Sequence, residues 1–131
     1  MFSESEKKFI EQHRDLIESK SYNRLLNKSG DINFITRLIL AMLYLSSPLN
    51  FIIRVTFSIT MSYRVTLTHP ECPSANFMFI RITNQDIYES TSKELRDIVE
   101  NKLIKSLVNS KVPSKLAEDL VRNKCDYEIA K

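Results

Sequence analysis

Sixteen consecutive residues, from position 53 to position 68, alternate strictly between apolar and polar side chains. A period of two residues is typical of a β-strand with one buried face, so this run predicts strand structure and assigns its core face. The odd-numbered positions are apolar and the even-numbered positions are polar. No even-numbered side chain is acidic, so the predicted solvent face carries hydroxyl and guanidinium groups.

The run is too long for one straight strand in a small domain, because sixteen residues would extend over about 53 Å at about 3.3 Å per residue. A two-residue hairpin loop would reverse the alternation, and the alternation never reverses. Two alternatives are left: a loop with an odd number of residues around Thr60 to Tyr63, or one continuous strand that bends. The run lacks Gly, Asn, Asp and Pro, which favours a bent strand over about 51–68.

Helical patterns precede this run. Ser3 and Glu6 have the spacing of a capping box at a helix start. A shorter helical segment follows, and Gly30 is placed to end it. From Ile32 to about Leu45 the chain is apolar nearly all round, which predicts a helix that is buried or covered by a partner.

A second strand and two helices are predicted behind the run. Residues 77–83 are apolar on both faces, which is typical of a strand inside a sheet or covered on both sides. Thr91 is placed to cap one helix and Pro113 to open another, and the chain from 122 to 131 is expected to fray from the last helix.

This order of elements predicts an α+β fold, with N-terminal helices, a small antiparallel sheet and two C-terminal helices. Two or three strands are not stable alone, so helices are expected to cover the odd-numbered face of the run. At 131 residues we expect a single domain with a helical part (1–47), a β part (50–84) and a second helical part (90–125).

Composition excludes several classes of protein. The single glycine argues against glycine-rich phosphate loops. The two cysteines form no disulfide framework, which fits a reducing compartment. No signal peptide is visible, and the longest apolar stretch is too short to span a membrane. We therefore expect a protein of a bacterial cytoplasm with no membrane segment.

Charge is distributed unevenly along the chain. The net charge is only +3, but the stretch from Lys20 to Arg81 holds seven basic and two acidic residues. An excess of positive charge in the middle of the chain predicts an anionic partner for that part. The alternative is that these charges are simply solvated.

His69 and Cys72 are the strongest candidates for chemistry. His69-Pro70-Glu71 resembles half of a zinc-deaminase signature, but the second half, P-C-x-x-C, is missing. Two ligands are too few for a stable zinc site, and a His69–Cys72 nucleophile pair would lack an orienting third group. We predict no catalytic residue, metal or cofactor, and we keep a small enzyme that uses His69 and Cys72 as a third alternative.

The polar face of the run is the candidate binding surface. Side chains on one face of a strand are about 6.6–7 Å apart, close to the phosphate repeat of a nucleic-acid strand. No aromatic residue interleaves among the even-numbered residues of this face, so base stacking is not predicted. There are two alternatives to a nucleic-acid-binding face. Either the polar face is simply exposed to solvent, or the run is an exposed strand edge that pairs with a second copy or another protein. The predicted partner-binding residues are Arg54, Thr56, Ser58, Thr60, Ser62, Arg64, Thr66 and Arg81.

The first 55 residues also resemble the helical head of uncharacterised proteins from low-GC Firmicutes and their phages. The segment EKKFIEQHRDLIESKSYNRLL, followed by ITRLILAML and PLNF, carries this resemblance. It implies a helical N-terminal part and brings no functional residue with it.

These observations predict a small non-catalytic protein that binds a larger macromolecular partner, a protein or a nucleoprotein. One form would be a phage or mobile-element inhibitor of a host nucleic-acid-directed defence enzyme, such as an anti-CRISPR protein. The alternative is direct nucleic-acid binding through the Arg/Thr face. A homodimer formed through the long strand is a further expectation.

Overall fold

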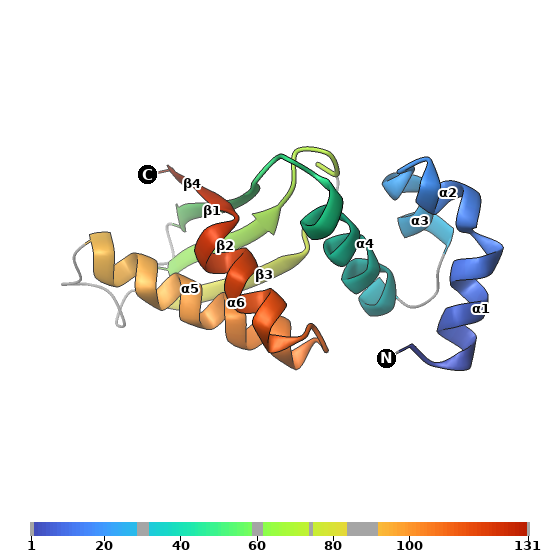
Figure 1. Cartoon of the computed structure of the whole chain (residues 1–131). Helices are drawn as coiled ribbons and strands as arrows, with labels where there is room; N and C mark the ends of the chain where they lie inside the picture. The colour runs from blue at the N-terminus through green and yellow to red at the C-terminus, as the bar shows by residue number, and fades with distance from the viewer. Residues whose placement is uncertain (1, 29–31, 59–61, 74, 84–91, 131) are drawn as a thin grey trace. The chain divides into compact units, whose positions relative to one another are not determined.

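The computed structural model describes residues 2–28, 32–58, 62–73, 75–83 and 92–130 (Figure 1). Backbone contacts divide the chain into two compact units, Met1–Leu45 and Ser46–Lys131. The first unit is helical, and the second contains the sheet and two helices. Among the described residues, no helix is both long and apolar enough to cross a membrane.

The N-terminal unit is built from four helices. The predicted capping box is present, because Ser3 Oγ accepts from the Glu6 amide at 3.2 Å and Glu6 Oε1 accepts from the Ser3 amide at 3.1 Å. Glu6 also pairs with Arg37 at 2.9 Å, which ties the first helix to the fourth. The predicted helix end at Gly30 lies outside the described residues. The helices are α1 (Glu4–Gln12), α2 (Arg14–Glu18), α3 (Tyr22–Lys28) and α4 (Ile32–Ser46).

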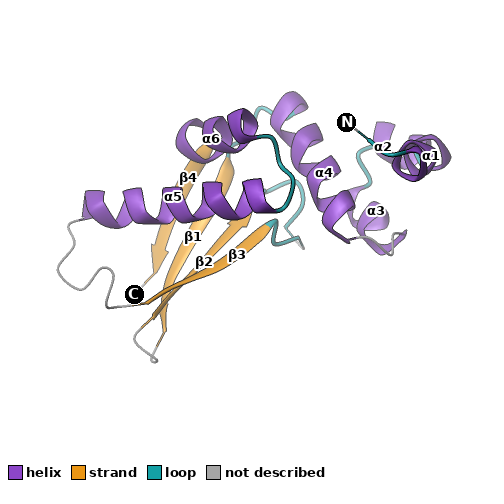
Figure 2. Cartoon of the chain, turned by 90° about the horizontal axis from the view of Figure 1, so that it is seen from below, coloured by secondary structure: helices purple, strands orange, loops and turns teal. Residues whose placement is uncertain are grey.

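The second unit is a four-stranded sheet with two helices on one face, which confirms the α+β class (Figure 2). The strand order is β3-β2-β1-β4. β1 runs antiparallel to β2 and parallel to β4, so the sheet is mixed and the purely antiparallel prediction was wrong. The elements are β1 (Phe51–Ser58), β2 (Ser62–Thr68), β3 (Met78–Thr83), α5 (Ser92–Asn109), α6 (Ser114–Asn123) and β4 (Cys125–Ala130).

The long alternating run folds back on itself, so the bent strand over 51–68 was wrong. Ser58 of β1 pairs with Ser62 of β2, which leaves a three-residue connection between them. This is the alternative with an odd-length loop, and it keeps the alternation in phase because both strands turn their odd-numbered residues to one face. Folding back is favourable because each strand then satisfies the backbone hydrogen bonds of the other.

The odd-numbered face is the core face, as predicted, except at Phe57, which is 43% exposed. Phe51, Ile53, Val55, Val65 and Leu67 are each at most 1% exposed. α5 and α6 cover this face of the sheet in Figure 2. Their own buried side chains include Val99, Leu103, Leu107, Ala117, Leu120 and Val121.

Two strands differ from the prediction. β3 was expected inside the sheet or covered on both sides, but it is an edge strand, and its Phe79 is 45% exposed. The segment expected to fray from the last helix forms β4 beside β1. Since β1 and β2 are both inner strands, the described part of the long run has no free edge to which a second copy could add a strand.

A buried carboxylate holds β4 against the helices. Glu100 of α5 is only 7% exposed, and its Oε1 accepts a hydrogen bond of 2.8 Å from the Tyr127 hydroxyl of β4. Arg96 and Arg122 lie 3.4 and 3.7 Å from the same carboxylate, and Arg96 also stacks over the Tyr127 ring at 4.2 Å. One carboxylate therefore connects α5, α6 and β4.

Candidate docking face of the sheet

The sheet face turned away from α5 and α6 is called the open face here (Figure 2). Strand register sets which side chains meet on it, because paired residues share a face. One row joins Arg81, Arg64 and Thr56 across β3, β2 and β1. The neighbouring row joins Phe79, Thr66, Arg54 and Glu128 across all four strands.

Arg64 and Arg81 form the positive part of this face. They are directly opposite each other on β2 and β3, and both are exposed. The Arg64 guanidinium lies over the Phe79 ring, 4.7 Å from its centroid, which holds the guanidinium against the sheet. In the described part of the chain, neither arginine has a carboxylate within ion-pair distance.

Arg54 lies in a different electrostatic environment. Its Nε donates to Glu128 Oε2 of β4 at 2.9 Å, and each side chain is about half exposed. Asp126, also on β4, accepts from the Asn50 side chain at 3.5 Å. The open face is thus basic over β2 and β3 and acidic along β4.

The predicted site residues are only partly brought together. Arg54, Thr56, Arg64, Thr66 and Arg81 share the open face, although the two threonines are half-buried. Ser62 is only 5% exposed, so it is not a surface hydroxyl as predicted. Ser58 closes β1, but its side chain and the whole of Thr60 lie outside the described residues.

Sequence reasoning missed Phe79 and the acidic edge, although signals for both exist. Phe79 shares its face with polar Arg81 and Thr83, so the period-two pattern of β3 has a solvent side. In β4, polar Asp126 and Glu128 alternate with apolar neighbours in the same way. The alternation of β4 is short and directly follows α6, so it resembles a frayed helix end in the sequence.

His69 and Cys72 are both buried in the segment between β2 and β3. His69 is 1% exposed, its Nε2 donates to the Leu49 carbonyl at 3.1 Å, and its Nδ1 accepts from the Glu71 amide at 3.1 Å. Neither ring nitrogen is therefore free to take a proton from a thiol. Cys72 is fully buried, and burial raises the pKa of its thiol, which disfavours the reactive thiolate. Among the described residues, no three potential ligands gather into a metal site.

Burial of His69 predicts a pH dependence of stability. Burial lowers the pKa of His69 in the folded protein, against the opposing effect of its bond to Leu49. The unfolded chain therefore binds a proton at a higher pH than the folded chain, and stability falls as pH drops below about 6.5. Between pH 7.5 and 5.5 we expect a loss of at most about 1.4 kcal/mol, measured by urea unfolding.

The matched variants for this test are His69→Gln and His13→Gln. The first should remove the pH dependence that is due to His69, and the second should retain that part, since His13 lies in the other unit. An equal loss between pH 7.5 and 5.5 in the wild type and in His69→Gln would contradict this assignment.

Comparison with known proteins adds no relative. No protein family, curated protein or solved structure matches this chain.

Proposed function

We propose that this chain is a non-catalytic binding protein whose open face docks an acidic surface of a larger protein partner. The observation that supports this most is the opposed pair Arg64 and Arg81. Like charges directly opposite each other on neighbouring strands destabilise a sheet, typically by up to about 1 kcal/mol. Carboxylates of a partner would remove that repulsion and gain charge-assisted hydrogen bonds.

The neighbouring Phe79 strengthens this proposal. Arginine and aromatic side chains are enriched among the residues that dominate interface energies. The guanidinium of Arg64 is already ordered by stacking on Phe79, so it loses less conformational freedom when a partner binds. Rigid strands rather than a loop present all three side chains.

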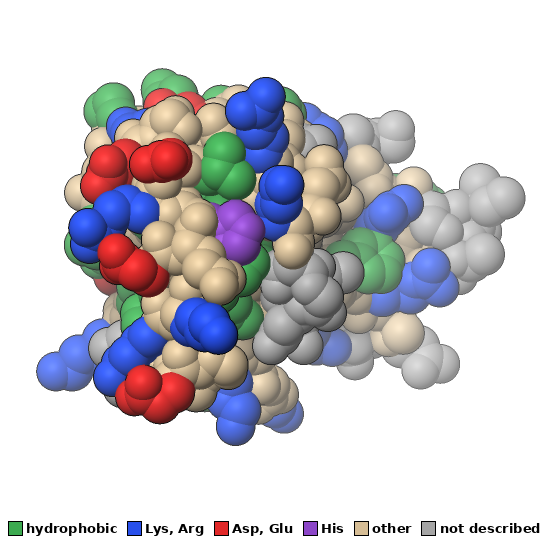
Figure 3. Space-filling model, turned by 90° about the vertical axis from the view of Figure 1, so that its right-hand side faces the viewer, with side chains coloured by type: hydrophobic (Ala, Val, Ile, Leu, Met, Phe, Trp, Pro, Cys, Tyr) green, Lys and Arg blue, Asp and Glu red, His purple; other side chains and the backbone are tan. Residues whose placement is uncertain are grey.

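A protein partner is favoured over a nucleic acid by the limited size of the basic area. Nucleic-acid binding relies on many phosphate contacts along a continuous basic track. Here Asp126 and Glu128 end the basic area on one side. Figure 3 shows the side of the N-terminal helices and not the open face, and on that side too acidic side chains lie among the basic ones.

Single-stranded nucleic acid is the second candidate partner, and the stacked pair of Arg64 and Phe79 favours it. Bases stack on aromatic rings and on guanidinium planes, and phosphates pair with arginine. Binding of this kind would weaken steeply with added salt.

The test compares two double variants that remove the same charge. Arg64→Gln with Arg81→Gln removes the opposed pair, and Lys105→Gln with Lys115→Gln removes two exposed charges from α5 and α6. Affinity purification from the source cells with quantitative mass spectrometry would identify the partner. We expect the first double variant to bind it about 30-fold more weakly, and the control within twofold of wild type.

Two results would overturn the proposal. One is equal binding of the partner by both double variants. The other is a salt-sensitive complex with a single-stranded oligonucleotide that depends on Arg64 and Arg81, which would establish the second candidate. An inhibitor of a host nucleic-acid-directed defence enzyme is one form of the proposed protein, and the identity of the captured partner would decide it.

A further inference from the structure

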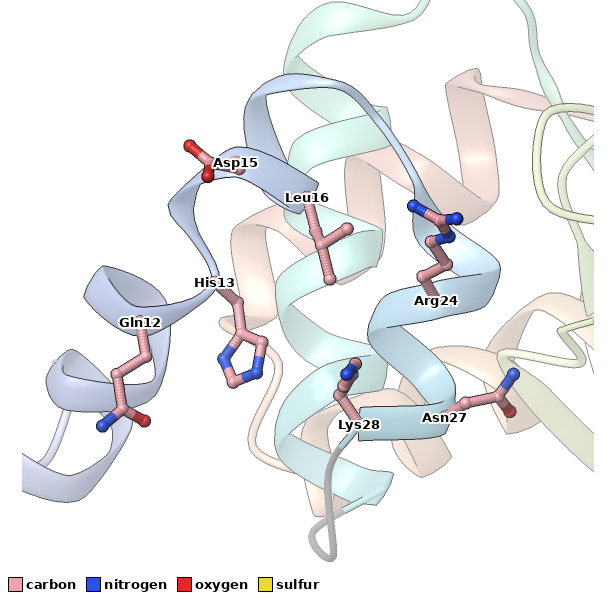
Figure 4. Close-up of a pocket in the computed structure, with 7 residues that line it drawn as sticks. All are labelled: Gln12, His13, Asp15, Leu16, Arg24, Asn27 and Lys28. Atoms are coloured by element: carbon pink, nitrogen blue, oxygen red, sulfur yellow. The ribbon is translucent and has the colours of Figure 1, made fainter.

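The N-terminal unit contains a pocket of about 620 Å³ between the α1–α2 junction and α3 (Figure 4). Its volume lies in the range of small-molecule sites. All of its lining residues come from positions 12–28, within one unit, so the pocket is independent of the docking face. Figure 4 shows His13 and Leu16 projecting from the α1–α2 side toward α3, which carries Arg24 and Lys28.

Arg24 and Lys28 give the pocket a positive side. They are four residues apart on α3, so they lie on the same side of the helix, and their mutual repulsion destabilises it slightly. Neither has an ion-pair partner among the described residues. The other two arginines of this unit are both paired, Arg14 with two glutamates and Arg37 with Glu6.

His13 adds an oriented polar side chain to the pocket. Its ring stacks on Phe9 with 4.1 Å between centroids, and its Nδ1 lies 3.0 Å from the Phe9 carbonyl oxygen. A carbonyl only accepts, so Nδ1 carries a proton and Nε2 is the ring nitrogen left for a ligand. A ligand hydroxyl could form a hydrogen bond with Nε2, and Leu16 also lines the pocket.

We propose that this pocket binds a small phosphorylated molecule that also carries a hydroxyl group. A phosphate monoester has a charge of about −1.5 to −2 and three acceptor oxygens, so it suits two cations one helical turn apart better than a carboxylate does. The phosphoryl oxygens bind Arg24 and Lys28, with the arginine able to bind two of them at once. Asp15 also lines the pocket, but its carboxylate points away from α3 in Figure 4, and the two cations outnumber this one acid.

The test is a titration of the full ¹⁵N-labelled chain with glycerol 3-phosphate, followed by NMR. We expect saturable shifts of amides in residues 12–28 with a Kd in the millimolar range, and no saturable shifts with glycerol alone. Arg24→Gln with Lys28→Gln should weaken binding about tenfold or more. The control, Lys8→Gln with Lys20→Gln, removes the same charge from exposed positions outside the pocket and should stay within twofold.

The proposal is overturned if glycerol 3-phosphate gives no saturable shift up to about 50 mM. It is equally overturned if the Arg24/Lys28 variant binds like wild type, or if the Lys8/Lys20 control weakens binding as much as the pocket variant. The last result would mean that binding of glycerol 3-phosphate depends only on the net charge of the unit and not on the pocket.

Discussion

Phe51→Ala is expected to destabilise the C-terminal unit by about 3–5 kcal/mol, the usual cost of removing a fully buried aromatic ring. Phe51 is 1% exposed in β1, an inner strand of the sheet. Its ring meets the rings of His69 and Phe77 edge-on, with centroids 4.6 and 6.0 Å away. The substitution leaves a cavity at that junction, and urea unfolding followed by circular dichroism would measure the loss of stability.

Phe79→Ala is the matched control, because it makes the same chemical change on the opposite face of the same sheet. Phe79 is 45% exposed, so its removal should cost less than about 1 kcal/mol of stability. It should instead weaken partner binding, since Arg64 would lose the ring that orders it. Similar losses of stability in the two variants would contradict the assignment of a covered face and an open face.

Glu100→Ala is expected to cost about 3 kcal/mol of stability, because one change removes the partner of three groups. The Tyr127 hydroxyl loses its 2.8 Å acceptor, and Arg96 and Arg122 lose their carboxylate. Burial and the bond to Glu100 both raise the pKa of the Tyr127 hydroxyl, so this group is neutral and acts as the donor at physiological pH. The same urea unfolding measurement applies.

Glu118→Ala serves as the control for Glu100. Glu118 lies on α6 and is exposed, and alanine is a good helix former, so stability should change by less than about 0.5 kcal/mol. Hydrogen exchange adds a local measurement. In Glu100→Ala, the β4 amides should lose more protection from exchange than the β2 amides. Unchanged β4 protection would show that the carboxylate does not hold this strand.

The alternating run illustrates how far pattern reasoning reaches. Its period of two residues predicted strands, assigned the buried face and excluded a two-residue hairpin loop, and each of these inferences is confirmed. The choice between a bent strand and a hairpin depended on the absence of turn-forming residues. That preference is weaker than the gain from pairing two long strands, so the hairpin forms without a typical turn sequence.

The candidate docking face shows the opposite case. Arg54, Arg64 and Arg81 looked equivalent in the sequence as members of one basic stretch. Glu128, which lies 74 residues from Arg54, comes to its side only because β4 pairs in parallel with β1. Arg64 and Arg81 meet each other through the register of β2 and β3.

Local periodicity therefore determined the two strands of the alternating run and their buried side, because these depend on neighbours a few residues away in the chain. It did not determine β4, or the edge position of β3. Which charges are neutralised, which stay unpaired, and which aromatic ring lies beside them depend on strand order and register. Strand order and register follow from contacts between distant segments. Only the tertiary structure therefore distinguished Arg54, which pairs with Glu128, from the opposed Arg64 and Arg81 of the proposed docking face.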